Sequence, residues 1–277
     1  MPSMYLAHAF QRPLEKEFVV VHWDRRGAGK SYFDDLPPET MRVSQEVEDT
    51  RELVGILLER FAQTRIILVG HSYGSYLGII VAQRFPDLFY AYVGVGQLAY
   101  SEARNRVVQD NWLGEQAEER GNTSLLRQLD AKVPIDREKW LFKFGGELHR
   151  KTSFASLLWL GLKAPEYSVW DVLKVRRGVS FTHRYMKYDV IDGELVDAVR
   201  HLDVPVYFFS GKYDYTDPFE LSEVYFDCLE APRKEFVWFE ESAHFPFLEE
   251  PIKFADELRR IATQTIPRDA SRASVRK

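Results

Sequence analysis

The sequence predicts an α/β fold, with a mostly parallel sheet flanked by helices and one helical insertion. Short apolar runs alternate with amphipathic segments along the 277 residues, and several of these runs are almost continuously hydrophobic. Such runs are typical of parallel strands buried on both faces. The composition, with 45% hydrophobic and 29% charged residues, is that of an ordinary globular protein.

Two elements are expected near the N-terminus. Residues 17–23 (EFVVVHW) predict a buried strand, because they are rich in valine and end in the charged turn DRRGAGKS. An amphipathic helix is expected from Ser44 to Phe61, where apolar residues recur at helical spacing and Ser44 is a suitable N-cap.

The next elements follow each other closely. Residues 65–70 (RIILVG) predict a strand, and a helix begins directly after it and stops before Pro86. Further strands are expected at residues 90–96, 204–211 and 235–241, and the last two are each followed by a helix-like segment. The alternation of strand and helix predicts the parallel sheet.

Between these strands lies a segment of different character. Residues 98–201 contain no comparable strand-like run, and aromatic residues and helix formers dominate. We expect a helical cap at 98–201, inserted into an α/β core formed by 1–97 and 202–265, with a flexible tail at 266–277. The cap tryptophans either fill a small helical core or line a ligand cavity. They are Trp112, Trp140, Trp159 and Trp170.

Charge and cysteine content limit the function classes. A net charge of -5 gives no electrostatic reason to expect a nucleic-acid partner. Cys228 is the only cysteine, which excludes an intrachain disulfide and fits a reducing compartment. No apolar run reaches the roughly 18 residues of a membrane-spanning helix, and no charged-then-apolar leader opens the chain. We therefore expect a cytoplasmic protein without a membrane partner.

One glycine-rich stretch resembles a phosphate-binding loop. GAGKS ends like G-x-x-x-x-G-K-[ST], but the first glycine of that motif is replaced by Asp24. A carboxylate there would repel a phosphate, so nucleotide binding is not favoured.

The strand at 65–70 runs directly into a nucleophile motif. Gly70-His71-Ser72-Tyr73-Gly74 fits G-x-S-x-G, in which the serine occupies a tight strand-to-helix turn. We expect the two glycines to remove Cβ atoms that would collide as strand and helix approach. The backbone N–H of Tyr73, at the helix N-terminus, is the expected oxyanion donor.

A serine hydroxyl becomes a nucleophile when a base takes its proton and an acid orients that base. His244 is the preferred base, because it follows the strand at 235–241 in a loop that can hang over Ser72. Asp214 is the preferred acid because it is closer than Asp217 to the end of the preceding strand. The order serine, acid, histidine is that of this architecture. The other histidines lack such a context: His71 and His22 are interpreted as structural, and His8, His149, His183 and His201 as solvated or packed.

Several segments together carry a family resemblance: VVHWDRRGAGKS, GHSYGS, YVGVGQ, GKYDYTDP and SAHFPF. On these the chain resembles the α/β-hydrolase superfamily and, within it, the proline iminopeptidase-like (prolyl aminopeptidase) branch. Its D-x-R-G-x-G-x-S turn is matched by Asp24, Arg26, Gly27, Gly29 and Ser31. The resemblance implies that the insertion is the family's cap, in which acidic residues commonly receive a substrate's free amino terminus. The candidates Glu102, Glu147 and Glu166 stay open.

The start of the chain departs from the family pattern. Family members have three earlier strands, the third ending in an H-G-G-P-G-like loop that supplies a second oxyanion N–H, and no such loop occurs here. We expect an N-terminally truncated α/β-hydrolase whose natural chain is longer, with strands at 17–23 and 65–70 that lack their shared neighbour. Loss of one oxyanion donor typically costs about 100- to 1,000-fold in rate.

The residues thus predict a serine hydrolase acting on an ester or amide of a small molecule or short peptide. Ser72 attacks the carbonyl, His244 transfers the proton and Asp214 steadies the imidazolium. The resemblance adds the release of N-terminal residues from peptides as one such activity, beside esterase and lactonase activities. No cofactor or metal is expected, and the substrate-binding residues and oligomeric state stay open. The alternative is a non-catalytic or weakly active binding protein, because half of the oxyanion hole is missing.

Overall fold

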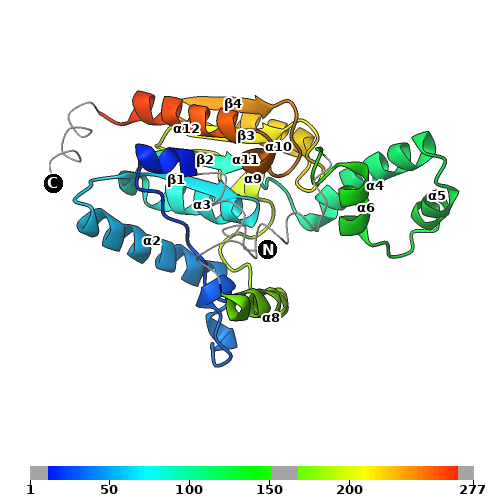
Figure 1. Ribbon diagram of the computed structural model, residues 1–277, viewed down its shortest axis with the longest axis horizontal. Helices are drawn as coiled ribbons and strands as arrows, with labels where there is room; N and C mark the ends of the chain where they lie inside the picture. Colours follow the sequence, from blue (N-terminus) through cyan, green and yellow to red (C-terminus); the bar gives the residue numbers. More distant parts are fainter. Residues whose placement is uncertain (1–11, 151–167, 268–277) are drawn as a thin grey trace. The chain divides into compact units, whose positions relative to one another are not determined.

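The computed structural model describes residues 12–150 and 168–267, and the chain divides into two compact units (Figure 1). The first unit comprises Met1–Ile66, Thr152–Asp192 and Pro251–Lys277. The second comprises Ile67–Lys151 and Gly193–Glu250. This division into two units does not test the predicted core, cap and tail, which therefore stay predictions.

A four-stranded sheet forms the centre of the second unit, in the order β1-β2-β3-β4 (Figure 1). The strands are β1 (Ile66–His71), β2 (Phe89–Val95), β3 (Val206–Gly211) and β4 (Lys234–Phe239). β2, β3 and β4 pair in parallel, and all six residues of β3 are buried. β1 lies at the edge, where Val69 is 41% exposed. The predicted parallel sheet and these four strands are confirmed.

Two helices cover the same face of this sheet. α3 (Tyr73–Arg84) contacts β2, because the hydroxyl of Tyr92 donates to the carbonyl oxygen of Ser75. α10 (Phe219–Cys228) contacts β3 through the rings of Tyr225 and Phe208. Gly94 and Phe208 are partners in the parallel register, so they point to the same face of the sheet. Tyr92, two residues before Gly94, points to that face as well, so α3 and α10 contact the same face. The short elements η4 (Pro86–Leu88) and α11 (Pro246–Glu249) complete this part of the unit.

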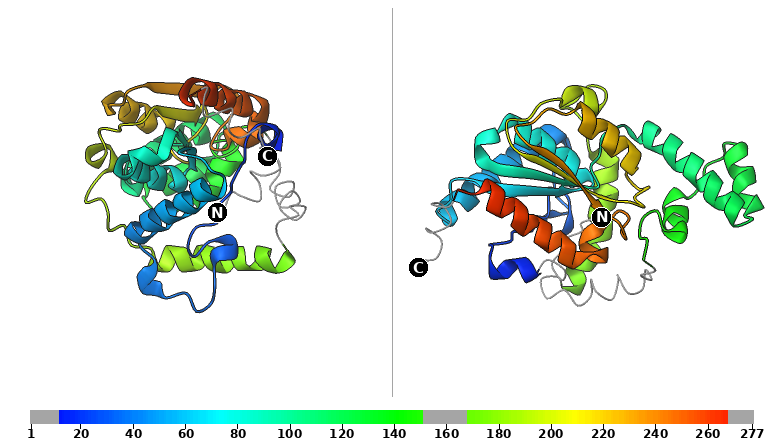
Figure 2. Two further views of the ribbon diagram at one scale, coloured as in Figure 1. Left: turned by 90° about the vertical axis from the view of Figure 1, so that its left-hand side faces the viewer. Right: turned by 90° about the horizontal axis from the view of Figure 1, so that it is seen from above.

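Further helices extend from the second unit on the side toward which the strands point, as Figures 1 and 2 show. Asn122 and Asp136 are side-chain N-caps, accepting hydrogen bonds from the backbone N–H groups of Leu125 and Lys139. These helices are α4 (Glu102–Glu119), α5 (Thr123–Asp130) and α6 (Arg137–Phe144), and the unit also contains the short helix α9 (Leu195–Ala198).

The first unit contains the glycine-rich turn. Its elements are η1 (Arg12–Lys16), η2 (Gly29–Ser31), η3 (Pro38–Thr40), α2 (Val43–Arg60), α8 (Val169–Tyr185) and α12 (Pro251–Thr265). A Cβ at Gly29 would collide with the carboxylate of Asp24, which accepts the backbone N–H of Lys30 at 2.9 Å. Arg26 reaches both oxygens of Asp49 at 2.7 Å. Asp24 thus stabilises the turn itself.

Two expectations in the first unit are wrong. Residues 19–25 have no regular secondary structure, and Val19 and Val21 are 65% and 46% exposed, so 17–23 is not a buried strand. A strand needs a hydrogen-bonded neighbour, and the described sheet has no strand paired with this segment. Ser44 is not an N-cap, because α2 already begins at Val43. Its backbone N–H and hydroxyl instead donate to the carboxylate of Asp189.

Several remaining expectations receive no test from the described residues. Most of the predicted tail (268–277), Glu166 and Trp159 lie outside the described residues. Among the residues that are described, none of the helices combines the length and apolarity needed to cross a membrane.

Candidate active site

Ser72 occupies the junction between β1 and α3 in a strained backbone conformation. Its φ is 54° and its ψ is −123°, a region that residues with a Cβ rarely adopt. Backbone hydrogen bonds hold it: its N–H donates to the carbonyl of Val95 at 2.9 Å, and its carbonyl accepts from the N–H groups of Ser75 and Tyr76 and from the hydroxyl of Ser75. The turn is therefore fixed by β2 and by the first turn of α3.

The two glycines of the motif differ in their roles. A Cβ at Gly70 would lie 2.2 Å from the carbonyl oxygen of Gly74, so only glycine lets β1 approach α3 this closely. A Cβ at Gly74 would meet no atom within 4 Å. The expected collision is thus found at Gly70 and not at Gly74.

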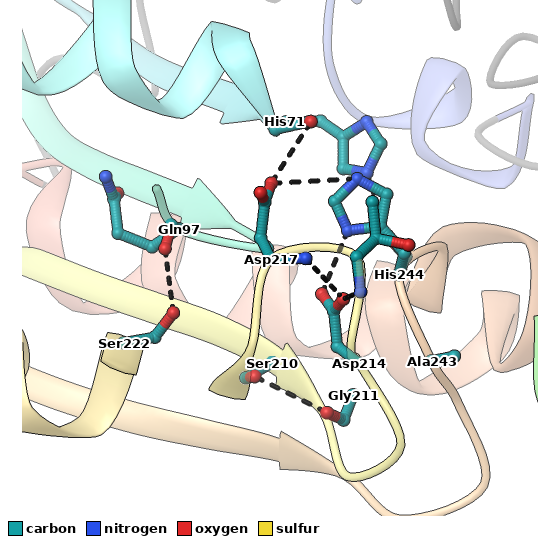
Figure 3. A network of polar contacts seen from close by, with 12 residues as sticks. His71, Gln97, Ser210, Gly211, Asp214, Asp217, Ser222, Ala243 and His244 are labelled. Carbon is teal, nitrogen blue, oxygen red and sulfur yellow. Dashed lines mark hydrogen bonds and ion pairs between the residues drawn. The ribbon is translucent and has the colours of Figure 1, made fainter. Parts of the chain in front are cut away.

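His244 and Asp214 form a buried pair in the loops that follow β4 and β3. Nδ1 of His244 lies 2.9 Å from Oδ2 of Asp214, and the two residues are 3% and 0% exposed (Figure 3). The other oxygen of Asp214 accepts the backbone N–H groups of Thr216 and Asp217, both at 3.0 Å. Both carboxylate oxygens are thus occupied, which fixes the carboxylate against the imidazole.

Gly96 provides the space for this pair. Its φ is 52°, and a Cβ there would lie 2.9 Å from two atoms of the His244 ring and 3.2 Å from the Asp214 carboxylate. Its N–H donates to the carbonyl of Phe209, which anchors the residue to β3. The end of β2 therefore forms a wall of the site that tolerates no side chain.

Asp217 lies near the other ring nitrogen of His244, Nε2. The hydroxyl of Ser72 donates to Oδ2 of Asp217 at 3.2 Å. The same oxygen lies 3.8 Å from Nε2 of His244 (Figure 3). Ser72 and His244, both described, make no direct hydrogen bond with each other. The structure thus brings Ser72, Asp214, Asp217 and His244 together, with Asp217 between the hydroxyl and the imidazole.

The charges of these groups shift one another's pKa. Burial alone would lower the pKa of His244, but the carboxylates of Asp214, Asp217 and Glu147 outweigh burial and raise it to about 9. Burial raises the pKa of Asp217 to about 6, against the opposing pull of the imidazole. Burial also raises the pKa of Glu147. The imidazole is therefore the positive centre of a buried acidic cluster.

His71 contacts His244 through its ring and through a hydrogen bond. Its Nε2 lies 2.8 Å from the carbonyl oxygen of His244, so this nitrogen carries the proton and donates. Burial, and then the charge of His244, hold the pKa of His71 well below its usual range, which keeps it neutral. Its ring packs against Phe245 and Phe247. The sequence signal for this contact is the position of His71 directly before the serine.

Contacts from α4 and from the segment after α6 hold the loop that carries both aspartates. Trp112 stacks on Tyr215 with a centroid distance of 4.3 Å, and Gln109 donates to the carbonyl of Thr216. The backbone N–H of Tyr215 donates to the carbonyl of Gly146. Sequence reasoning missed these contacts, because they join segments about 70 to 110 residues apart and have no local signature. At least one tryptophan of the insertion thus contacts the acid loop.

Three further predicted residues, Tyr73, Glu102 and Glu147, have different positions. Tyr73 is the first residue of α3, so its backbone N–H lies at the positive end of the helix dipole. Glu102 is exposed and pairs with Arg106, and it lies at the start of α4. The backbone carbonyl of Glu147 accepts the N–H of His244 at 3.0 Å, so Glu147 borders the site.

Comparisons with known proteins identify the family of the chain. A family model described as "Alpha/beta hydrolase family" matches residues 1–257. The chain belongs to the α/β-hydrolase family. Probable aminopeptidase YbaC of Bacillus subtilis (strain 168) is 32% identical over 269 residues, which cover 93% of this chain and 84% of that protein. The predicted α/β-hydrolase, proline iminopeptidase-like assignment is therefore confirmed.

Solved structures extend the likeness in fold. The proline iminopeptidase of Mycobacterium smegmatis superposes with a TM-score of 0.69 at 16% identity, covering 98% of this chain and 87% of that chain. A proline iminopeptidase-related protein from Thermus thermophilus gives a TM-score of 0.59 at 20% identity, covering 95% of this chain and 85% of that chain. At these identities the likeness concerns the fold alone.

Proposed function

We propose that this α/β-hydrolase is a serine hydrolase that cleaves ester or amide bonds of a small substrate, including the release of N-terminal residues from short peptides. Ser72 is the nucleophile, His244 the general base and acid, and Asp214 the residue that orients the imidazole. The observation that carries the proposal is the strained serine at the β1–α3 junction in one compact unit with the buried His244–Asp214 pair. The 32% identity to a probable aminopeptidase supports the peptide substrate.

The proposed reaction begins with a turn of the Ser72 hydroxyl. That hydroxyl and His244 Nε2 lie 3.2 Å and 3.8 Å from the same Asp217 oxygen, and the movement that the mechanism requires is a rotation about the Cα–Cβ bond of Ser72. The base form of His244 then removes the proton as Oγ attacks the carbonyl carbon. The Tyr73 N–H stabilises the oxyanion, His244 protonates the leaving group, and water releases the acyl group.

A second candidate is a non-catalytic or weakly active binding protein. The observation that favours it is the hydrogen bond from Ser72 to Asp217, which keeps the hydroxyl away from His244. Both candidates share the fold, so they differ only in whether the serine is activated.

A fluorophosphonate probe separates the two. We expect covalent labelling of the wild-type chain that is lost in Ser72→Ala and strongly reduced in His244→Ala. The matched control is His201→Ala, which removes a histidine that contacts a carboxylate, Asp203, at 3.0 Å on the surface. Labelling that persists in Ser72→Ala contradicts the assignment of the nucleophile. A folded wild-type chain that takes up no probe and hydrolyses neither aminoacyl anilides nor acyl esters favours the binding protein.

The substrate class can be determined by comparing the turnover of three chromogenic compounds. Turnover of the p-nitroanilides of proline and alanine is compared with turnover of p-nitrophenyl propionate. Preference for the two anilides supports release of N-terminal residues. Turnover of the ester alone restricts the proposal to an esterase.

A further inference from the structure

We propose that Asp217 binds the free α-ammonium group of the substrate and thereby makes the site select unblocked amino termini. This inference rests on the proposed function, since it takes Ser72 as the nucleophile. It starts from a buried carboxylate that the proposed acyl transfer does not use.

The position of Asp217 fits an ammonium ion by distance. In an aminoacyl substrate, the nitrogen is bonded to the carbon next to the carbonyl carbon that Ser72 attacks. The attacked carbon must come within about 3–3.5 Å of Oγ, and the ammonium therefore lies within a few ångströms of the same oxygen. Oδ2 of Asp217 is 3.2 Å from Oγ. The ammonium and the Asp217 carboxylate are thus close enough to the same oxygen for an ion pair to form between them.

The hydrogen bonds of the two aspartates separate their roles. Asp214 uses one oxygen on His244 and the other on two backbone N–H groups, so both of its oxygens are already engaged and the residue is fully buried. The carboxylate of Asp217 accepts one hydrogen bond among the described residues, the one from Ser72. When Oγ turns to His244 for attack, that bond is lost, and the carboxylate, which is 8% exposed in this structure, keeps only the imidazole 3.8 Å away as a charged neighbour and has no hydrogen-bond donor. An incoming ammonium replaces the lost donor.

The same carboxylate disfavours substrates without a cation. Attack on a carbonyl creates negative charge beside Ser72, and an uncompensated carboxylate nearby opposes that charge. An ammonium bound to Asp217 removes this repulsion. It also weakens the electrostatic attraction between Asp217 and the imidazole of His244. That imidazole still faces the carboxylates of Asp214 and Glu147 and the neutral ring of His71. Asp217 therefore both attracts amine-bearing substrates and selects against neutral ones.

Asp217→Asn tests the inference, because it removes the charge and keeps an acceptor for Ser72. We expect the KM for alanine p-nitroanilide to rise about 10- to 100-fold, the loss of one hydrogen bond between charged groups. The kcat/KM for p-nitrophenyl propionate, which lacks the amino group, should rise, because the variant removes the carboxylate that opposes the negative charge developing beside Ser72. Asp217→Glu should restore part of the preference for the amine. Asp203→Asn, an exposed aspartate in the same unit, is the control and should change neither substrate.

The outcomes distinguish this inference from the proposed function. Equal loss on both substrates in Asp217→Asn overturns it and makes Asp217 a residue that only positions Ser72. Unchanged kinetics on both also overturns it. If Ser72→Ala retains turnover of both substrates, the proposed function itself fails.

A wild-type measurement applies even where the variants fold poorly. Because protonation removes the charge of Asp217, the KM for alanine p-nitroanilide should rise as the pH falls through about 6. The KM for p-nitrophenyl propionate should not change over this range. Parallel changes in the two KM values contradict the inference.

Discussion

Adding one methyl group at Gly96 is a direct test of the His244–Asp214 geometry. A Cβ there would lie 2.9 Å from Cε1 and Nδ1 of His244, and ordinary contacts begin at 3.4 Å. Gly96→Ala must therefore displace the imidazole or the carboxylate by about 0.5 Å, the difference between those two distances. The left-handed φ of 52° adds strain of about 1–2 kcal/mol in any L-residue.

The expected loss of activity follows from this displacement. A misplacement of 1 Å can cost about 100-fold in rate, so about 0.5 Å predicts a fall of about tenfold in kcat/KM. Tenfold corresponds to about 1.4 kcal/mol of transition-state stabilisation. The assay is steady-state turnover of alanine p-nitroanilide, with urea unfolding measured on the same preparation.

Gly121→Ala is the matched control. Gly121 has a φ of 63°, and a Cβ there would meet no atom within 4 Å. It therefore carries the same kind of backbone strain without contact to the site, and Gly121→Ala should lose about 1–2 kcal/mol of unfolding free energy. Gly96→Ala should lose at least as much, because its Cβ also displaces buried groups. Only Gly96→Ala should lose activity. If Gly96→Ala unfolds like Gly121→Ala but keeps wild-type kcat/KM, the placement of His244 and Asp214 is not critical and the reasoning is refuted.

Three further predictions follow from the contacts around the site. In His71→Phe the carbonyl of His244 loses its buried donor, which should cost about 1–3 kcal/mol in urea unfolding and lower kcat; unchanged values in both measurements contradict this. Trp112→Leu removes the stack on Tyr215, worth about 0.5–1.5 kcal/mol, and should also lower kcat by loosening the acid loop; a stability loss with unchanged kcat would mean that the loop needs no such support. Asp217→Asn should stabilise the fold by about 1–3 kcal/mol above pH 6, because a pKa raised from 3.8 to about 6 opposes folding by about 1.4 kcal/mol per unit once the group is ionised. This gain should disappear below about pH 4, where the carboxyl is protonated in both states; a gain that is independent of pH contradicts the charge argument.

The elements that the sequence predicts well are those with strong local signals. The apolar runs at 65–70, 90–96, 204–211 and 235–241 correspond to β1 to β4, because buried parallel strands need continuous hydrophobic residues. The turn at Ser72 is equally local, since Gly70 removes a Cβ that would collide with the backbone of Gly74. Short-range sterics fix both kinds of feature.

The failures depend on partners distant in the chain. The run EFVVVHW has the composition of a strand, but no strand of the described sheet pairs with it. Ser44 is a residue type that often caps helices, yet here its own N–H, in the first turn of α2, donates to the carboxylate of Asp189, 145 residues away. Composition reports the preference of a segment, whereas pairing and capping depend on what packs beside it.

The choice between Asp214 and Asp217 shows most clearly what spacing leaves open. Both follow β3 in KYDYTDP, and distance from the strand end favours Asp214. In the structure, the two backbone N–H groups bound to Asp214 turn the loop so that Asp214 faces Nδ1 of His244. The same turn brings Asp217, three residues later, to the side of Nε2 and Ser72. The two carboxylates are therefore not alternatives for one role: because Nε2 must exchange protons with Ser72, only the group at Nδ1 can orient the base. The group at Nε2 has to release Ser72 before attack, and a substrate that brings its own cation makes that release favourable.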